Sequence, residues 1–432
     1  MPVTAVVGAA WGDEGKGKIA DALAAGAGVV ARFQGGRNAG HTIVNDLGRF
    51  ALHLLPSGVF RPGVTNLLGP GVAVDPAALL EELDGLTAAG VPAPDLVISD
   101  RAQVVLPTHV LADRCEEERL GARAFGSTRA GMAPFYADKC LKVGVRVGDL
   151  FDPAWLRERL GRSLASRNVL FRHLYGREEV TVDGLCDHLS PMIERLRPMV
   201  RDTGALLRRR LAAAERVLAE GQLGALRDPD HGIYPYSTSS STLAGFACVG
   251  LGVPPRSMDE VVAVAKAYSS CVGAGPFVTE WRGEAAQELR RRGGDRGEYG
   301  ATTGRARRVG PFDAVATRYG CRLQGATSAA LTNLDVLGYL DEIPLCTAYR
   351  IGGRETTDFP CTRDLERAEP VYQTFPGWRA DVSGIRRWQE LPDAARRYVD
   401  RLEALIETPV SLISVGPHRR ALIRRQPGAP DA

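Results

Sequence analysis

Glycines and charged side chains crowd one short segment near the N-terminus. Gly12, Gly17 and Lys18 have the spacing G-x-x-x-x-G-K of a phosphate-binding loop. Glycines let backbone N–H groups converge on phosphate oxygens, and the N-terminus of a following helix adds a favourable dipole. Ile19 replaces the Ser or Thr that usually follows the lysine and binds magnesium. Asp13 is placed to take over as a magnesium ligand, because an acid among phosphate oxygens needs a metal or a proton transfer to offset its repulsion.

A second glycine-rich segment follows a short apolar run. Gly35 and Gly36 precede the sequence Asn-Ala-Gly-His-Thr at positions 38–42. A lone histidine is more often structural than catalytic. Because His41 lies in a polar, glycine-rich loop just after a predicted strand, the sequence leaves both roles open for it.

The elements that must position these loops alternate along the chain. Residues 3–8 are mostly apolar and rich in β-branched side chains, which predicts a strand, and residues 18–25 have the pattern of a helix. Asp75 followed by Pro76 predicts the start of another helix that continues to about Leu86. Strands alternating with helices predict an α/β fold with a mainly parallel central sheet. The further predicted strands are residues 28–33, 50–55, 65–68, 96–99, 330–337, 345–351 and 410–415.

One segment departs from this alternation. Residues 153–226 are rich in Leu, Arg, Ala and Glu at helical spacing, which predicts a mostly helical insertion. No repeat or low-complexity linker divides the chain. Residues 1–425 are therefore predicted to form one domain with a helical subdomain at about 153–226, and residues 426–432 a frayed tail.

Composition and charge argue against several classes of protein. The 432 residues are 44% hydrophobic and 24% charged, an ordinary globular balance. The formal net charge of +3 is too small to argue for nucleic-acid or membrane partners. Eight scattered cysteines without a Cys-x-x-Cys pair favour reduced thiols in the cytoplasm over disulfides or a zinc site. Neither a secretory signal nor an apolar run of about 18 residues is visible.

The two glycine-rich signatures together resemble those of the adenylosuccinate synthetase family. They comprise residues 11–18 and, in the second signature, 34–36 and 38–42. The resemblance continues in order along nearly the whole chain. Its further motifs are residues 53–58, 230–232, 234–236, 272–277, 301–305, 334–337 and 414–417.

The resemblance implies a ligase with GTP as co-substrate and one Mg²⁺ per subunit. Such an enzyme phosphorylates the 6-oxygen of IMP and displaces the phosphate with L-aspartate, giving adenylosuccinate, GDP and phosphate. Asp13 would remove the N1 proton of the purine, and His41 would donate to the oxygen that bridges the β- and γ-phosphates. The Asp13 carboxylate and the Gly40 carbonyl would bind the metal.

The family's binding residues carry over by motif position. Lys142 stands where the family has an arginine that reaches the partner's monophosphate site, so the resemblance implies a homodimer. The implied GTP site comprises Gly12, Asp13, Glu14, Gly15, Lys16, Gly17, Lys18, Gly40, His41, Thr42, Arg307, Asn333, Leu334, Asp335, Ser414, Val415 and Gly416. The implied IMP site comprises Asp13, Lys16, Asn38, Ala39, Gly40, His41, Thr128, Lys142, Leu223, Thr238 and Arg305. The implied aspartate site comprises Ala301, Thr302, Thr303, Gly304, Arg305 and Arg307, whose two arginines suit a dicarboxylate.

The chain departs from the family pattern mainly around the purine. Leu223 occupies the position of a glutamine that contacts the purine edge, and Gln222 lies one residue early. Losing that hydrogen bond would cost roughly 1 kcal/mol. Arg129 and Ala130 replace a Gly-Arg pair, so an arginine is displaced by one position. Asn333 replaces a lysine of the guanine-binding motif, which weakens the prediction of GTP.

Three functions therefore stay open. The first is the synthesis of adenylosuccinate from IMP. The second is the same chemistry in a specialised paralogue, on an IMP-like nucleotide of, for example, nucleoside-antibiotic biosynthesis. The third is a nucleotide-binding switch without ligase activity, against which the aspartate loop and His41 argue.

Overall fold

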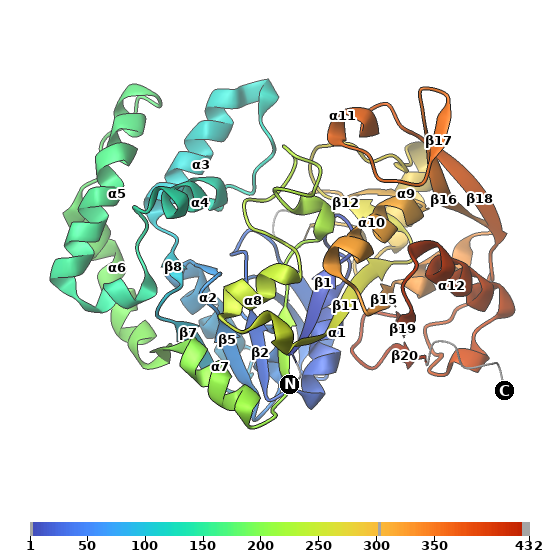
Figure 1. Ribbon diagram of the computed structural model, residues 1–432, viewed down its shortest axis with the longest axis horizontal. Coiled ribbons are helices and arrows are strands. Elements are labelled where there is room, and N and C mark those ends of the chain that lie inside the picture. The colour runs from blue at the N-terminus through green and yellow to red at the C-terminus, as the bar shows by residue number, and fades with distance from the viewer. Residues whose placement is uncertain (1–2, 301–303, 426–432) are drawn as a thin grey trace.

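A ten-stranded sheet runs through the middle of the molecule (Figure 1). The computed structural model describes residues 3–300 and 304–425. All neighbouring strands of this sheet are parallel except the last pair, β19 and β20, which confirms the predicted α/β fold with a mainly parallel sheet. In spatial order the strands are β20 (Leu422–Arg424), β19 (Val410–Ser414), β15 (Ser328–Thr332), β11 (Met258–Lys266), β1 (Val3–Gly8), β10 (Val217–Glu220), β2 (Val29–Arg32), β5 (Thr65–Leu68), β7 (Leu96–Ser99) and β9 (Val200–Arg201).

The central strands are buried along their whole length. All six residues of β1 and all four of β2, β5, β7 and β10 are buried, as expected for parallel strands covered on both faces. Three of the central strands nevertheless end in a charged residue, namely Arg32, Glu220 and Lys266. Ligands of open parallel sheets bind at the carboxyl ends of the strands. These buried charges therefore mark the edge where a site is expected.

Helices cover both faces of the sheet. α1 follows the phosphate loop, and α2 begins as predicted, with the Asp75 carboxylate accepting from the backbone N–H of Ala78 at 3.1 Å. None of the helices in the described part of the chain is both long and apolar enough to cross a bilayer. The helices are α1 (Lys16–Leu23), α2 (Pro76–Ala88), α3 (Pro107–Leu120), α4 (Met132–Leu141), α5 (Pro153–His173), α6 (Val182–Leu196), α7 (Thr203–Ala212), α8 (Gly245–Leu251), α9 (Gly283–Arg292), α10 (Ala314–Gln324), α11 (Thr362–Leu365) and α12 (Asp393–Ile406).

Smaller sheets complete the fold. Figure 1 shows helices α3–α6 at one end of the molecule and β16–β18 with α12 at the other. The additional strands are β3 (His41–Asn45) with β4 (Gly48–Leu52), β6 (Ala73–Val74) with β8 (Gln103–Val104), β12 (Ser269–Cys271) with β13 (Arg308–Gly310), and β14 (Phe312–Asp313) with β16 (Glu342–Ile351), β17 (Arg354–Thr356) and β18 (Glu369–Pro376).

The predicted helical insertion contains two strands of the main sheet, β9 at its edge and β10 near its centre. α5, α6 and α7 lie in the segment 153–226, and α5 and α6 share one hydrophobic cluster with α2, β5 and β7. β10 also lies in this segment, yet it pairs with β1 and β2 at the centre of the sheet. The helical part therefore ends before Val217. Four apolar residues are too few for periodicity to separate a buried strand from a helix.

Other predicted elements also have different boundaries. The strand predicted at 50–55 is β4, which begins at Gly48 and ends at Leu52. The strand predicted at 330–337 ends at Thr332, because Asn333 has φ 59° and turns the chain into the 3₁₀ helix Leu334–Tyr339. The helix after the phosphate loop begins at Lys16 instead of residue 18. His41 does not lie in a loop: it is the first residue of β3 and pairs with Leu52.

Candidate active site

Two crevices meet at the carboxyl edge of the central sheet. The inner crevice, about 280 Å³, lies among residues 13–18, 40–42, 294–300, 332–335 and 414–417. The outer crevice, about 540 Å³, lies among residues 125–128, 227–239 and 272–274. The residues that line both crevices are Asp13, Ala39, Gly40, Leu223 and Gly300. The proposed general base therefore lies at the junction of the two spaces.

The phosphate loop is folded around one buried acid. Gly12, Asp13 and Gly15 all have positive φ (96°, 61° and 90°), which makes the loop tight enough to expose its amides. The Glu14 carboxylate accepts from the backbone N–H groups of Ala10 at 3.1 Å and Gly12 at 2.8 Å. The side chain of Glu14 is buried and points away from the inner crevice, so any contact of Glu14 with GTP would have to come from its backbone.

The two lysines of the loop have different partners. Lys16 lines the inner crevice and pairs with the Glu14 carboxylate at 2.5 Å. Lys18 donates to Ser414 Oγ and the Gly416 carbonyl, both at 2.6 Å, and so fastens α1 to the loop after β19. Burial lowers the pKa of Lys18 to about 7, and the charge of Asp335 opposes that shift. The lysine that aligns with the phosphate-loop motif is thus part of the wall of the crevice.

His41 is held as a neutral ring with a defined tautomer. Arg32 Nη1 lies 3.2 Å from His41 Nδ1, and a guanidinium can only donate, so Nδ1 accepts and the proton is on Nε2. Burial, and then the charge of Arg32, hold the pKa of His41 well below its usual value. Nε2 is buried without a hydrogen-bond partner; its nearest carboxylate oxygen, on Glu220, is 3.5 Å away. The ring therefore carries an unsatisfied donor at the wall of the inner crevice.

Arg32 and Glu220 form the support beneath this ring. They are register partners on the adjacent strands β2 and β10, and both are almost completely buried. Glu220 accepts from the Ser57 backbone N–H at 2.8 Å and the Ser57 hydroxyl at 2.7 Å. Burial raises the pKa of Glu220, and the charge of Arg32 opposes that shift. The pair fixes the guanidinium that in turn fixes the His41 tautomer.

A second buried network holds Asp13. Arg307 Nε donates to Asp13 Oδ2 at 3.0 Å, and its Nη1 donates to Glu298 at 2.7 Å. Glu298 also accepts from Lys266 at 2.7 Å and from the Tyr268 hydroxyl. Burial acts to raise the pKa of Glu298, but Lys266 and Arg307 outweigh it and lower the value to about 2. Burial likewise acts to lower the pKa of Arg307, and Asp13 with Glu298 hold it above its usual range.

The far end of the inner crevice offers an unsatisfied acceptor. Asp335 lines this end, and its Oδ1 is buried without a hydrogen-bond partner. Burial raises the pKa of Asp335. Asn333 also lines the crevice but directs its Nδ2 to the Tyr268 hydroxyl at 3.1 Å. An acceptor of this kind suits the N–H groups of a guanine ring.

Leu223 and Gln222 have exchanged the roles that the family pattern gives to this segment. Leu223 has φ 62° and lines both crevices, where a Cβ placed on Gly12 would lie 3.4 Å from its Cδ2. Gln222 also lines the inner crevice, but its amide donates to the carbonyls of Gly36 at 2.7 Å and Ala39 at 2.8 Å. The amide that would face a purine therefore braces the second glycine-rich loop, and an alkyl group faces the junction.

Several polar residues line the outer crevice, whereas two residues that depart from the family pattern lie outside its lining. Asn38, Thr128, Thr238 and Arg305 line it, as the sequence predicts for the monophosphate and aspartate sites. Arg227, which the sequence analysis missed, braces its wall by donating to the carbonyls of Tyr236 and Val272, both at 2.5 Å. Ala130 is buried and Arg129 is exposed outside the crevice.

Some predicted residues do not reach either crevice. Leu334 and Val415 are completely buried in the core, and exposed Lys142 ends helix α4 with φ 65°. Gly12, Glu14 and Gly304 are absent from both linings among the described residues. The predicted aspartate residues Ala301, Thr302 and Thr303 lie outside the described residues.

The supporting residues Arg32, Glu220, Lys266 and Glu298 were missed by sequence reasoning. Three of them end an apolar strand run with a charge, and that interruption was the available signal. No group of three or more His, Cys, Asp or Glu side chains suited to a metal occurs in residues 3–300 or 304–425. A metal at the junction would therefore need oxygen atoms from a ligand beside Asp13 and Gly40.

Comparison with known proteins gives the same family at every level. The sequence profile described as adenylosuccinate synthetase matches residues 5–423. An adenylosuccinate synthetase of Parafrankia sp. is 45% identical over 420 residues, which cover 97% of this chain and 98% of that protein. The fully ligated adenylosuccinate synthetase structure from Plasmodium falciparum superposes with a TM-score of 0.91 at 33% identity, covering 99% of this chain and 100% of that one.

A more distant structure shares the fold alone. The succinoaminodeoxyadenylate synthetase of cyanophage S-2L has a TM-score of 0.57 at 20% identity, over 98% of this chain and 95% of that one. The family profile and the full-length relatives confirm the resemblance that the motifs predicted. This chain belongs to the adenylosuccinate synthetase family.

Proposed function

We propose that the junction of the two crevices is where this GTP-dependent ligase joins IMP to L-aspartate, with the triphosphate in the inner crevice and the monophosphate in the outer one. Family membership supplies the reaction. The observation that supports its location is the position of Asp13, which lines both crevices. A base at this point can reach a purine on one side while a phosphoryl donor approaches from the other.

The first step is phosphorylation of the purine 6-oxygen. Asp13 takes the N1 proton, and the 6-oxygen attacks the γ-phosphorus as the bond to the β–γ bridging oxygen breaks. Negative charge develops on that bridging oxygen. The unpartnered Nε2–H of His41 is suited to donate to it, since Arg32 fixes the proton on Nε2. In this structure Asp13 is paired with Arg307, so substrate must loosen that ion pair before Asp13 can accept a proton.

The second step is displacement of the phosphate by aspartate. The aspartate amine attacks C6, loses a proton, and phosphate leaves with the former 6-oxygen. Arg305 lines the outer crevice, and Arg307 lines the inner one. Two guanidinium groups on either side of the junction suit the two carboxylates of aspartate, together with residues 301–304.

The junction also suits one Mg²⁺ per subunit. Asp13 provides a carboxylate and Gly40 a carbonyl, and both line the two crevices. Mg²⁺ is commonly held by one or two carboxylates together with substrate phosphates. Bound there, the ion would neutralise charge on the phosphate oxygens.

The proposal also covers the recognition of guanine, the homodimer, the domain organisation and the cellular location. Asp335, with its unpartnered Oδ1, would accept from the guanine of GTP, next to Asn333 and the Ser414–Gly416 backbone. Exposed Lys142 would reach the monophosphate site of a second copy in a homodimer. Residues 1–425 would act as one domain. The eight cysteines, all free thiols in the structure, favour the cytoplasm.

The test is phosphate release by the purified chain with GTP, IMP, L-aspartate and Mg²⁺. We expect release to require all four, and to fall by about a thousandfold in Asp13→Ala, as for loss of a general base. Asp341→Ala, which changes an exposed aspartate outside both crevice linings, is the matched control and should retain most activity. Equal activity in Asp13→Ala and the wild type would refute the assignment of the base.

A second candidate is the same reaction on an IMP-like nucleotide. The observation in its favour is that Leu223 faces the junction while Gln222 is engaged elsewhere. Any such substrate must keep an N1–H beside a 6-keto group for Asp13 to act. Steady-state rates with a panel of IMP analogues decide between the two: a clear preference for IMP over every analogue removes this candidate.

A further inference from the structure

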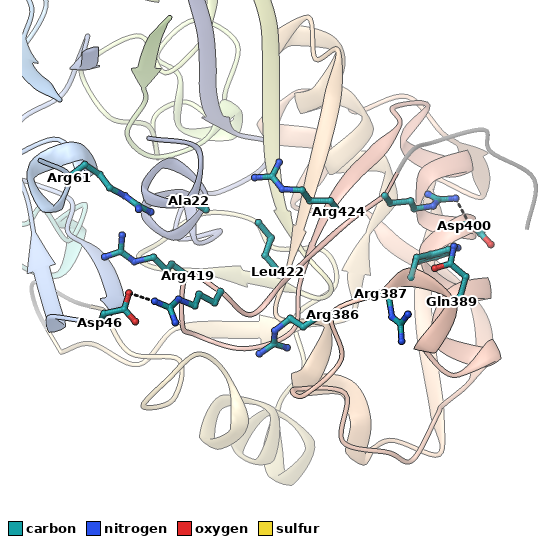
Figure 2. Close-up of a pocket in the computed structure, with 13 residues that line it drawn as sticks. Ala22, Asp46, Arg61, Arg386, Arg387, Gln389, Asp400, Arg419, Leu422 and Arg424 are labelled. Carbon is teal, nitrogen blue, oxygen red and sulfur yellow. Dashed lines mark hydrogen bonds and ion pairs between the residues drawn. The ribbon is translucent and has the colours of Figure 1, made fainter. Parts of the chain in front are cut away.

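A third hollow, about 1050 Å³, lies beside the edge strand β20 and outside both crevices. Seven of its thirteen lining residues are arginines, at positions 61, 386–387, 419–420 and 424–425, and we call it the arginine hollow. Figure 2 labels five of these arginines, at positions 61, 386, 387, 419 and 424, among the residues that line the hollow. None of its lining residues lines the inner or the outer crevice. It is therefore a separate site that the ligase reaction does not use.

Positive charge exceeds negative charge at one wall of the hollow. Asp21, on α1, is the shared partner of Arg61 at 3.5 Å and Arg419 at 3.1 Å. Burial raises the pKa of Asp21 to about 6, so its charge is costly to maintain there. The Nε of Arg419 is buried without a hydrogen-bond partner, and the Nε of Arg61 has only its 3.5 Å contact with Asp21. One carboxylate thus offsets two guanidinium groups that remain partly unsatisfied.

Two other arginines of the hollow have no carboxylate partner among residues 3–300 and 304–425. Arg386 donates only to the carbonyls of Ser383 and Ile385, both at 2.7 Å. Arg424 is exposed on β20 and forms no ion pair within the described chain. Its neighbour Arg425, by contrast, pairs with a carboxylate on α12. The hollow therefore holds unneutralised charge at two points on different segments.

Protection of the sheet edge does not explain this arrangement. Basic residues on an exposed edge strand discourage pairing with other chains, and this suffices for the arginines of β20 itself. Arg61, Arg386 and Arg419 come from three other segments. Figure 2 shows all three beside the same space as Arg424. Edge protection requires no such convergence, whereas binding of a multiply charged anion does.

We propose that the arginine hollow binds a phosphate chain of three or more groups, either free or carried by a nucleotide. Guanidinium groups form bidentate pairs with phosphate oxygens, and like charges gathered in a concave wall focus the field on an anion. The volume is of the size of known ligand pockets, which span about 300–1,000 Å³. A chain of three phosphates has more charge and more oxygen atoms than a single phosphate, so it can pair with more of these guanidinium groups.

The experiment is calorimetric titration of the full chain with inorganic tripolyphosphate at low salt. Arg386→Gln with Arg424→Gln removes the two charges without carboxylate partners, and binding should weaken by about tenfold or more. Arg172→Gln with Arg177→Gln makes the same change in net charge on exposed side chains outside the linings of the hollow and both crevices, and should change binding by less than about threefold. Lys16→Ala tests binding at the phosphate loop instead. Turnover does not enter the readout, so failure here is distinguishable from failure of the proposed ligase.

Each outcome decides the proposal. Loss in the Arg386/Arg424 variant together with retention in the other two supports it. No binding at all, loss only in Lys16→Ala, or equal weakening in both double variants overturns it. The binding that is lost in the Arg386/Arg424 variant is then compared between tripolyphosphate and ATP. Equal affinity indicates that the hollow binds a phosphate chain alone, and tighter ATP binding indicates that it binds a nucleotide.

Discussion

The inner and outer crevices meet at Asp13, yet their walls are built in different ways. In the inner wall, Arg32 with Glu220 and Lys266 with Glu298 are nearly completely buried, and each pair supports another residue that faces the site. The outer wall combines acidic side chains of helix α3 with polar groups on loops, and Leu223 faces the space in place of an amide. A buried charge cannot be replaced alone without leaving its partner uncompensated. A loop side chain at a crevice wall can be exchanged at little structural cost, so substrate choice can change on the outer side while the phosphate chemistry on the inner side stays fixed.

The largest expected effect removes one of the buried charges. Arg32→Met leaves Glu220 buried without its counter-charge, and we expect unfolding free energy to fall by about 3–5 kcal/mol in denaturant titrations. Arg305→Met in the outer crevice is the control, with a loss of at most about 1 kcal/mol. The double variant Arg32→Met with Glu220→Gln should recover part of the loss. Equal losses for Arg32→Met and Arg305→Met would remove the distinction between the two walls.

The next effect is on catalysis at the inner wall. His41→Asn removes the donor that faces the bridging oxygen, and we expect turnover to fall by about a hundredfold with little change in stability. His188→Asn, which changes an exposed histidine on α6 outside both crevice linings, should lower turnover by less than about threefold. Similar turnover in the two variants would mean that His41 is a structural residue.

A smaller effect concerns the outer wall. Leu223→Gln returns an amide to the junction, and we expect kcat/KM for IMP to rise by about fivefold to tenfold through one added hydrogen bond. Leu120→Gln, elsewhere on the same crevice, should give no increase. If Leu223→Gln leaves kcat/KM for IMP unchanged, Leu223 does not contact the base.

The smallest effect is a pH dependence at Lys18. Its folded-state pKa of about 7 lies below the ordinary value of 10.5, so between these values the unfolded chain binds more protons than the folded chain. Stability should therefore rise with pH above about 7, by at most about 1.4 kcal/mol per pH unit, and this contribution should be absent in Lys18→Met. Parallel pH profiles of the two proteins would show that Lys18 keeps its proton when folded.

Local sequence patterns predicted the phosphate loop of the inner crevice better than the buried charged residues that position its side chains. Gly12, Gly17 and Lys18 lie within a few residues of one another, so their spacing alone predicts a phosphate loop. Arg32 and Glu220 are distant in the chain and meet only through the register of β2 with β10, which no local pattern contains. For the same reason β10, four residues long, was included in a helical segment.

For the outer crevice, the sequence showed which residues differ from the family pattern but not how their side chains are oriented. The displacement of Gln222 and Leu223 was visible in the sequence, but the direction of each side chain was not. That direction depends on the positive φ of Leu223 and on Gly35, where a Cβ would lie 1.9 Å from Gln222 Oε1. Only the folded loop shows that the amide braces the carbonyls of Gly36 and Ala39.

The central claim is that the 6-oxygen of the purine, activated by Asp13, attacks the γ-phosphoryl group across the junction. The most direct measurement uses IMP labelled with ¹⁸O at the 6-position, with GTP and L-aspartate, and mass analysis of the phosphate released. We predict that each phosphate carries one ¹⁸O atom, because the former 6-oxygen leaves with it. Phosphate free of the label would show that water or aspartate attacks the γ-phosphoryl group, and would contradict this account.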